Sequence, residues 1–284
     1  MKTEPDREPP ESESLRSALR GYARGVMGAL LVSMPLLATM EMWWLGFTIP
    51  PFRLLLFLVA NFALLIVLEY YSGFQKGHVR LWEEVQDAVD AYGIGLLVAV
   101  IVLFLFGVIG PGMSLREVAG KVILEAIPLS IGASIAMSIF GDQDGHRERR
   151  KRRAGFWGSQ LIGLAGAAYF GFNVAPTEEP VMIGLGLSWW HAVLLVLFGL
   201  LLTHAIVYSV GFAGGHALPG GRSWWGSLLR AGVVSYTGAL LVTVCLLWLF
   251  GRIDVVTGLT PSVHMIVTLG FINALGSAAA KLII

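Results

Sequence analysis

Long apolar runs, separated by short polar or proline-containing breaks, dominate the sequence. Eight of these runs could cross the roughly 30 Å hydrocarbon core of a bilayer, which takes about 20 residues in a helix. The eight runs are Val26–Phe47, Arg53–Phe74, Ala88–Ile109, Val118–Phe140, Phe156–Ala175, Ser188–Phe212, Arg230–Gly251 and Pro261–Ile284. Because backbone groups in lipid need partners within their own segment, we expect all eight runs to be α-helices.

The polar positions repeat along the chain. The pattern YxxGFxxGH occurs at Tyr70–His78 and again at Tyr208–His216. The same interval separates Glu41 from Glu179, and a threonine precedes each of these glutamates by two positions. Two polar motifs that recur in the same order indicate an internal duplication. We call the interval from Glu41 to Glu179 the shorter interval.

An insertion of six residues around 217–226 lengthens the interval for the later matches. There Tyr92 and Gly132 correspond to Tyr236 and Gly276. We call the interval from Tyr92 to Tyr236 the longer interval. The two intervals together relate the second half of the chain to the first.

This duplication predicts the fold class and the organisation of the chain. We expect an all-α, polytopic membrane protein with eight transmembrane helices, arranged as two tandem parallel four-helix repeats. An even number of spans gives both halves the same orientation, with a pseudo-two-fold axis along the membrane normal. The expected segments are a disordered cytoplasmic tail at 1–15, a first repeat at 16–141, a basic cytoplasmic linker at 142–153 and a second repeat at 154–284.

Small and isolated polar residues predict where these helices meet. Glycines allow two helices to approach closely in a membrane. The candidates are Gly25, Gly28, Gly132, Gly163, Gly166 and Gly276. Isolated polar residues within apolar runs, such as Asn61 and Asn273, are expected to form interhelical hydrogen bonds.

Composition supports a membrane protein and excludes several other classes. Hydrophobic residues make up 56% of the 284 residues and charged residues 14%, against about 25% charged in an average soluble domain. The mean hydropathy is +0.72. The net charge of +1, without a gathered basic face, predicts no nucleic-acid partner. The single cysteine, Cys245, lies in an apolar run, which excludes a disulfide framework and a thiolate metal cluster.

The distribution of basic residues predicts the orientation in the membrane. Six arginines and lysines lie in the linker at 142–153, and a dense positive loop marks the cytoplasmic side. With eight spans, both termini are then cytoplasmic, and we expect a multi-pass protein of the cell inner membrane. Residues 1–14 are acidic and lack an apolar core, so they predict a solvated tail and not a signal peptide.

The matched glutamates are the leading candidates for a functional site. Glu41 and Glu179 are expected at the outer ends of the first and fifth spans, with Thr39 and Thr177 two positions before them. Carboxylates at a narrow mouth can bind and concentrate cations, and Ca²⁺ prefers oxygen ligands. Glu178 could assist as an ion ligand, or could share a proton with its neighbour because adjacent carboxylates raise each other's pKa. The alternative is that these glutamates face water beside an aromatic belt.

Other ionisable residues suggest a proton pathway. His78 and His216 end the two copies of YxxGFxxGH at the inner interface, where they could relay protons or belong to a helix-end structure. His204, near the middle of its span, is a further relay candidate, with interhelical hydrogen bonding as the alternative. Glu125 lies in mid-span on one helix face with Lys121 and Glu117, so we expect these three side chains to pair.

These residues favour a membrane cation channel or channel-like permease with an outer glutamate ion site. Its partners would be an inorganic cation (Ca²⁺, K⁺, Na⁺ or H⁺), the lipid bilayer and further copies of the chain in a homo-oligomer. The alternatives are a proton-coupled secondary transporter and a membrane scaffold or sensor that transports nothing. The sequence contains no HExxH motif, nucleophile elbow, P-loop or dinucleotide fingerprint, so we expect neither an enzyme nor a cofactor.

Two resemblances extend this interpretation. The run Ala-Pro-Thr-Glu-Glu-Pro at 175–180, together with the repeated four-helix layout, resembles an uncharacterised family of bacterial integral membrane proteins over most of the chain. That resemblance implies topology and no activity. A helix with Arg24 at its cytoplasmic end and Glu41 at its outer end also resembles the Orai-type calcium channels, in which such a glutamate binds the ion. The duplication, and the larger separation of Arg153 from Glu179, depart from that pattern.

Overall fold

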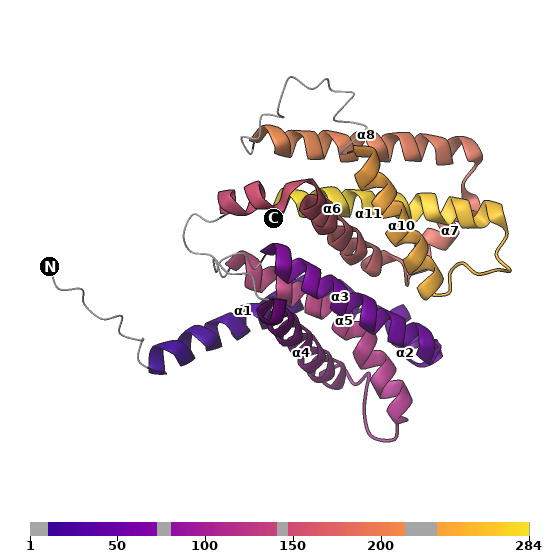
Figure 1. Ribbon diagram of the computed structural model, residues 1–284. Helices are drawn as coiled ribbons and strands as arrows, with labels where there is room; N and C mark the ends of the chain where they lie inside the picture. Colours follow the sequence, from indigo (N-terminus) through magenta and orange to yellow (C-terminus); the bar gives the residue numbers. More distant parts are fainter. Residues whose placement is uncertain (1–10, 73–80, 141–146, 214–231, 284) are drawn as a thin grey trace.

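The computed structural model describes residues 11–72, 81–140, 147–213 and 232–283, and the regular elements in these ranges are helices (Figure 1). In chain order they are α1 (Glu11–Leu37), α2 (Met40–Thr48), α3 (Pro51–Ser72), α4 (Leu81–Leu105), α5 (Leu115–Phe140), α6 (Arg147–Val174), α7 (Glu179–Gly186), α8 (Trp189–Ala213), α10 (Val234–Leu249) and α11 (Leu259–Ile283). The prediction of an all-α chain is confirmed for the described residues.

Five of these helices are long and apolar enough to cross a membrane. The candidate spans are Pro51–Tyr70, Glu84–Leu105, Leu115–Met137, Trp189–Ile206 and Leu259–Lys281, and Val234–Leu249 is a shorter apolar helix. These helices make the chain a multi-pass membrane protein, while the total of eight spans stays a prediction.

The first predicted span is two helices and not one. α1 ends at Leu37, and Thr39 has an extended backbone (φ −92°, ψ 112°) before α2 begins. The Thr39 hydroxyl donates to the carbonyl oxygen of Pro35 at 2.6 Å, so it bonds to the end of α1 and breaks the apolar run. α7 likewise occupies a segment that was predicted to connect two spans. Each half therefore contains a short helix in addition to its long ones.

The predicted tail and linker are partly helical. α1 begins at Glu11, within the segment 1–15, and α6 begins at Arg147, within the segment 142–153. The polar residues at 11–15 and 147–153 include no proline or glycine, and arginine, lysine and glutamate are good helix formers. High polarity therefore did not prevent these residues from extending α1 and α6.

Each half is built around one central helix. α5 contacts α1, α2, α3 and α4, and α11 contacts α6, α7, α8 and α10. Close approach depends on glycine: a Cβ at Gly28 would overlap Ala136 and the Gly132 carbonyl, and a Cβ at Gly166 would overlap Ala280 and the Gly276 carbonyl. The predicted close contacts at these glycines are confirmed. In α5 and α11, most of the residues in the membrane-spanning part are buried.

The ends of α4 and α10 have the same backbone geometry. Gly107 and Gly251, which follow these helices, have φ values of +70° and +72°. This left-handed conformation is common where a helix ends, and glycine adopts it without strain. In both turns the next residue donates its N–H to the carbonyl five positions back, at 2.9 and 2.8 Å, as in a Schellman motif.

The two halves meet through α3, which packs against α6 (Figure 1). The ring of Phe57 on α3 lies 5.2 Å from the Phe172 ring of α6 and 4.9 Å from the ring of Phe250, the residue after α10. These centroid distances are typical of favourable aromatic pairs. The rings of Phe172 and Phe250 also contact each other, at 5.0 Å. The contact between the halves is thus an aromatic cluster that belongs to the buried core.

Candidate functional site

The candidate glutamates lie at one end of the helices, which we call the glutamate end. It comprises α2, α7, the loop 106–114 and the loop 250–258. α2 packs on α5 at Gly46, where an added Cβ would overlap the backbone of Lys121. α7 packs on α11 in the same way, with Gly184 against the backbone of Met265. The short helices are therefore fixed to the central helices by glycine contacts.

Glu41 lies in the first turn of α2 and is partly exposed. A carboxylate is favourable there because the free N–H groups at a helix N-terminus carry partial positive charge. Thr39, at the N-cap position, uses its hydroxyl to bond the Pro35 carbonyl. Thr39 keeps its oxygen lone pairs for a further partner, so it stays a candidate ligand beside Glu41.

Glu178 and Glu179 differ in their partners, although they are adjacent. Glu178 accepts a hydrogen bond from Arg252 at 2.7 Å in an ion pair, and Arg252 also donates to the Pro176 carbonyl. Glu179 lies in the first turn of α7 and is exposed. The pKa of Glu179 is lowered, first by the Thr177 hydroxyl, then by its own backbone N–H and by the charge of Arg252. Glu179 is therefore a carboxylate at neutral pH.

These partners speak against the idea that Glu178 and Glu179 share a proton. Mutual repulsion raises the pKa of adjacent carboxylates, but Arg252 compensates the charge of Glu178 and the pKa of Glu179 is lowered. The Thr177 hydroxyl also lies 2.8 Å from the Val174 carbonyl, so its single proton serves either that carbonyl or the Glu179 carboxylate.

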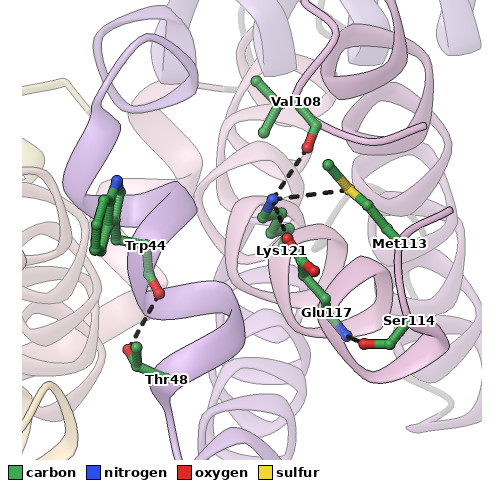
Figure 2. A network of polar contacts seen from close by, with 7 residues as sticks. All are labelled: Trp44, Thr48, Val108, Met113, Ser114, Glu117 and Lys121. Carbon is green, nitrogen blue, oxygen red and sulfur yellow. Dashed lines mark hydrogen bonds and ion pairs between the residues drawn. The ribbon is translucent and has the colours of Figure 1, made fainter. Parts of the chain in front are cut away.

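A second polar network joins the loop 106–114 to α5 (Figure 2). Lys121 donates to the Glu117 carboxylate at 2.7 Å and to the Val108 carbonyl at 3.1 Å, and its Nζ lies 3.9 Å from the sulfur of Met113. The Ser114 hydroxyl accepts the backbone N–H of Glu117 at 3.2 Å, which caps the start of α5. Because Lys121 is largely buried, this network fixes the loop against the helix.

The environment of Glu125 differs from the predicted one. The expected three-residue pairing is half right: Lys121 pairs with Glu117, while both carboxyl oxygens of Glu125 are buried without a hydrogen-bond partner. Glu125 is ten residues from the start of α5, about 15 Å along the helix axis, which is near the middle of a span. Pro128, three positions on, cannot donate to the Leu124 carbonyl, which loses its intrahelical partner.

Helical spacing alone could not have found this arrangement. Lys121 lies four positions from both Glu117 and Glu125, and its choice depends on the Val108 carbonyl, which approaches from the loop. That loop comes close only when α4 and α5 have packed. The charge of Glu125 and its central position in an apolar run were the available signals.

The other predicted polar residues are distributed over both halves. Asn61 donates to Ser130 at 2.9 Å and Asn273 to Thr243 at 2.8 Å, so the predicted interhelical hydrogen bonds of these asparagines are confirmed. His204 is buried in α8, fifteen residues from its start, about 22 Å along the axis from the glutamate end. His78 and His216 lie outside the described residues.

The described residues contain no group of three or more histidine, cysteine, aspartate or glutamate side chains that could hold a metal ion. Glu41 lies on α2 and Glu179 on α7, and their assignment as metal or ion ligands stays a prediction.

Comparison with protein families supplies a match over nearly the whole chain. A family model described as "Putative integral membrane protein (DUF2391)" matches residues 21–284. No curated protein and no solved structure matches the chain. The family description agrees with the apolar helices described above.

Proposed function

We propose that this chain, which belongs to the DUF2391 family of integral membrane proteins, is a proton-coupled secondary transporter. Glu125 would be the residue that takes up and releases the proton. The supporting observation is the buried, unpartnered carboxyl of Glu125 at the centre of the first half. A charge within a bilayer is costly, so an ionisable residue in such a position is a functional candidate. The transported substrate is a cation or another small solute that moves with the proton.

The surroundings of Glu125 suit such a role. A carboxylate without a partner in an apolar interior is strongly disfavoured, whereas the protonated form carries no charge. Proton release therefore requires access to water or a cation, which a conformational change would provide. The break in the hydrogen bonding of α5 at Pro128 is a site where the helix could bend during that change.

A cation channel with an outer ion site is the second candidate. It is favoured by the position of Glu41 and Glu179, which lie in the first turns of the two short helices. The Thr39 and Thr177 hydroxyls would complete this site, and Glu178 would join it when a cation replaces Arg252 as its partner. Glu179 is charged at neutral pH and exposed, as a ligand for Ca²⁺, K⁺ or Na⁺ must be. His204, His78 and His216 remain relay candidates for the proton.

We also propose the tandem duplication, with eight spans in two parallel repeats. Its support is the correspondence of helix bounds. Pro51 and Trp189, which begin α3 and α8, are separated by the shorter interval, and Leu115 and Leu259, which begin α5 and α11, by the longer one. The positive-φ glycines that follow α4 and α10 are also related by the longer interval. In this proposal the protein lies in the cell inner membrane, with both termini cytoplasmic and the glutamate end outside.

Purified protein in liposomes tests these functions. Under an inward proton gradient we expect pH-dependent uptake, measured for K⁺, Na⁺ and Ca²⁺ together with proton flux. Glu125→Gln keeps the side-chain shape but cannot titrate, so it should abolish the pH-dependent component. Asp254→Asn, which removes an exposed carboxylate at the same end as Glu41 and Glu179, is the control and should transport normally.

The glutamate variants separate the candidates. If flux is insensitive to Glu125→Gln and is lost in the double variant Glu41→Gln with Glu179→Gln, the cation channel is correct and the proton-coupled mechanism is not. Unaltered flux in all variants would contradict both site assignments. Absence of flux under every gradient would leave the scaffold or sensor as the function.

A further inference from the structure

The contact between the two halves has a defined chemical pattern. On α3, the Arg53 guanidinium lies over the Trp248 ring of α10, with 5.2 Å from its central carbon to the ring centroid. The Arg53 side chain also lies beside Gly251. One helical turn further on, Phe57 packs against Phe250. The first half thus presents α3, and the second half presents the C-terminal end of α10.

The proposed repeat places an equivalent of each surface elsewhere on the molecule. The shorter interval maps Arg53 and Phe57 of α3 onto His191 and Leu195 of α8. The longer interval maps the end of α10 onto the end of α4, with the pairs Trp248/Phe104, Leu249/Leu105, Phe250/Phe106 and Gly251/Gly107. Among the described helices, α4 packs mainly on α1, α3 and α5, and α8 packs on α10 and α11, so each of these helices packs within its own half.

Side chains at the end of α4 are more exposed than the equivalent side chains at the end of α10, as expected for an interface that has no partner within the chain. Phe250 is 5% exposed but Phe106 is 50% exposed, and Leu249 is 9% exposed but Leu105 is 73% exposed. An added Cβ at Gly251 would meet Arg53, whereas one at Gly107 would meet nothing within 4 Å. His191 on α8 is exposed as well. The ends of α4 and α10 share the same backbone geometry, but no helix in the described part of the chain covers the end of α4 as α3 covers the end of α10.

We propose that α8 of a second copy of this chain covers the end of α4, in the way that α3 covers the end of α10 within the chain. His191 of the second copy would lie over Phe104, and Leu195 would pack on Phe106. The proposal rests on the duplication and not on transport, so transport activity has no bearing on it.

Lipid could cover these apolar side chains as well, because exposed apolar residues are normal on a membrane-spanning helix. The end of α4 nevertheless keeps the left-handed turn and the aromatic residues with which the end of α10 contacts α3. Equivalence to the interface inside the chain, through the proposed duplication, favours a second copy as the partner.

The geometry of this interface is head-to-tail. α4 and α8 lie at opposite edges of the molecule as drawn in Figure 1, so the two surfaces of one chain cannot meet each other. A surface pair of this kind is heterologous, and its repetition closes a ring when the rotation allows. In a membrane, parallel repeats would place the axis of the ring along the membrane normal. The expected assembly is therefore a closed oligomer and not a two-fold dimer.

Paired cysteines in native membranes test the interface, in a Cys245→Ser background that removes the single native thiol. On treatment with a bifunctional maleimide, which bridges thiols too far apart for a disulfide, the double variant His191→Cys with Phe104→Cys should form covalently linked dimers and higher oligomers. Each single variant should remain monomeric, because a heterologous contact does not bring identical residues together. The pair Arg53→Cys with Trp248→Cys is the positive control, and the same reagent should bridge it within one chain, because the native side chains meet there.

The matched negative control is His191→Cys with Phe52→Cys, since Phe52 is an exposed residue near the start of α3. Intermolecular linkage of the test pair should exceed that of this control several-fold. Equal yields would show that the linkage comes from random encounters and would overturn the proposal. Absence of linkage while the positive control links would also overturn it. Replacement of Phe104 and Phe106 by alanine should shift the protein toward monomers in single-molecule photobleaching, and Phe52→Ala should not.

Discussion

At the scale of single residues, the two halves differ most in their buried polar groups. Lys281 on α11 is equivalent to Met137 on α5 by the longer interval, and each packs against a glycine of the neighbouring first helix. Lys281 donates to Gln160 at 3.0 Å and to Ser235 at 2.5 Å. These partners are neutral, so they satisfy its hydrogens without compensating its charge.

Lys281→Met should therefore be tolerated or should raise the thermal unfolding temperature in detergent. Methionine is the residue at the equivalent position of the first half, Met137, and the substitution removes an uncompensated buried charge. Such replacements are often neutral or stabilising. Lys281→Ala should lower the stability by about 2 kcal/mol or more, because it leaves a cavity. Equal loss in both variants would show that the charge itself stabilises the fold.

The pKa of Glu179 provides a pH test of the glutamate end. The ordinary value is 4.5, and the Thr177 hydroxyl lowers it in the folded protein. A group with a lowered folded-state pKa contributes stability above its unfolded pKa, and loses it as pH falls through the folded value. Thr177→Val should raise the pKa of Glu179 towards 4.5, measured by carboxyl-carbon NMR with Glu179→Gln to assign the signal.

Thr48→Val is the matched control for this titration. The Thr48 hydroxyl bonds to backbone carbonyls within α2 (Figure 2) and serves no carboxylate. A shift of the Glu179 signal in Thr48→Val but not in Thr177→Val would contradict the assignment.

The Glu41 and Glu179 positions were predictable because a polar motif recurs in sequence. The isolation of Glu125 was not, because it depends on which carboxylate Lys121 selects in three dimensions.

At the scale of helices, glycine decides how closely α1 and α5 approach. Gly28→Val should destabilise the protein by about 1–3 kcal/mol, the usual cost of overpacking, because the added atoms overlap Ala136 and the Gly132 carbonyl. Gly21→Ala lies on the same helix with open space around it and should be neutral or stabilising by up to about 1 kcal/mol. Thermal unfolding in detergent distinguishes the two variants, and a Gly28→Val protein as stable as the parent would contradict the close contact at this glycine.

Apolar length predicted the long helices well, and it predicted the short ones poorly. A run of apolar residues shows that a segment avoids water but not that its axis continues in one direction. The break at Thr39 depends on one hydroxyl bond to the Pro35 carbonyl. The position of α2 depends on the fit of Gly46 against α5. Both are tertiary features, so the sequence pattern Val26–Phe47 could not distinguish a straight span from a span followed by a short helix.

At the scale of the whole molecule, the proposed duplication implies that the framework was preserved and the polar interior changed. The glycine contacts of α1 with α5 recur between α6 and α11. In contrast, Glu125 of α5 has Leu269 as its equivalent in α11, and both are fully buried. Backbone packing tolerates few substitutions at a close contact, whereas a buried side chain of similar size can gain or lose charge. The asymmetry supports one proton site per chain rather than two.

Parallel repeats would place the glutamate ends of both halves on the same side of the membrane. Leu115, at the start of α5, and Val255, in the loop before α11, are exposed residues at the glutamate end of different halves. If the repeats are parallel, cysteine at either position must be reached from the same side. In intact cells with Cys245→Ser, an impermeant maleimide should label both Leu115→Cys and Val255→Cys. Gln86→Cys, at the start of α4, should react only after permeabilisation. Labelling on opposite sides would contradict parallel repeats, while labelling of Gln86→Cys alone would keep the repeats and reverse their orientation.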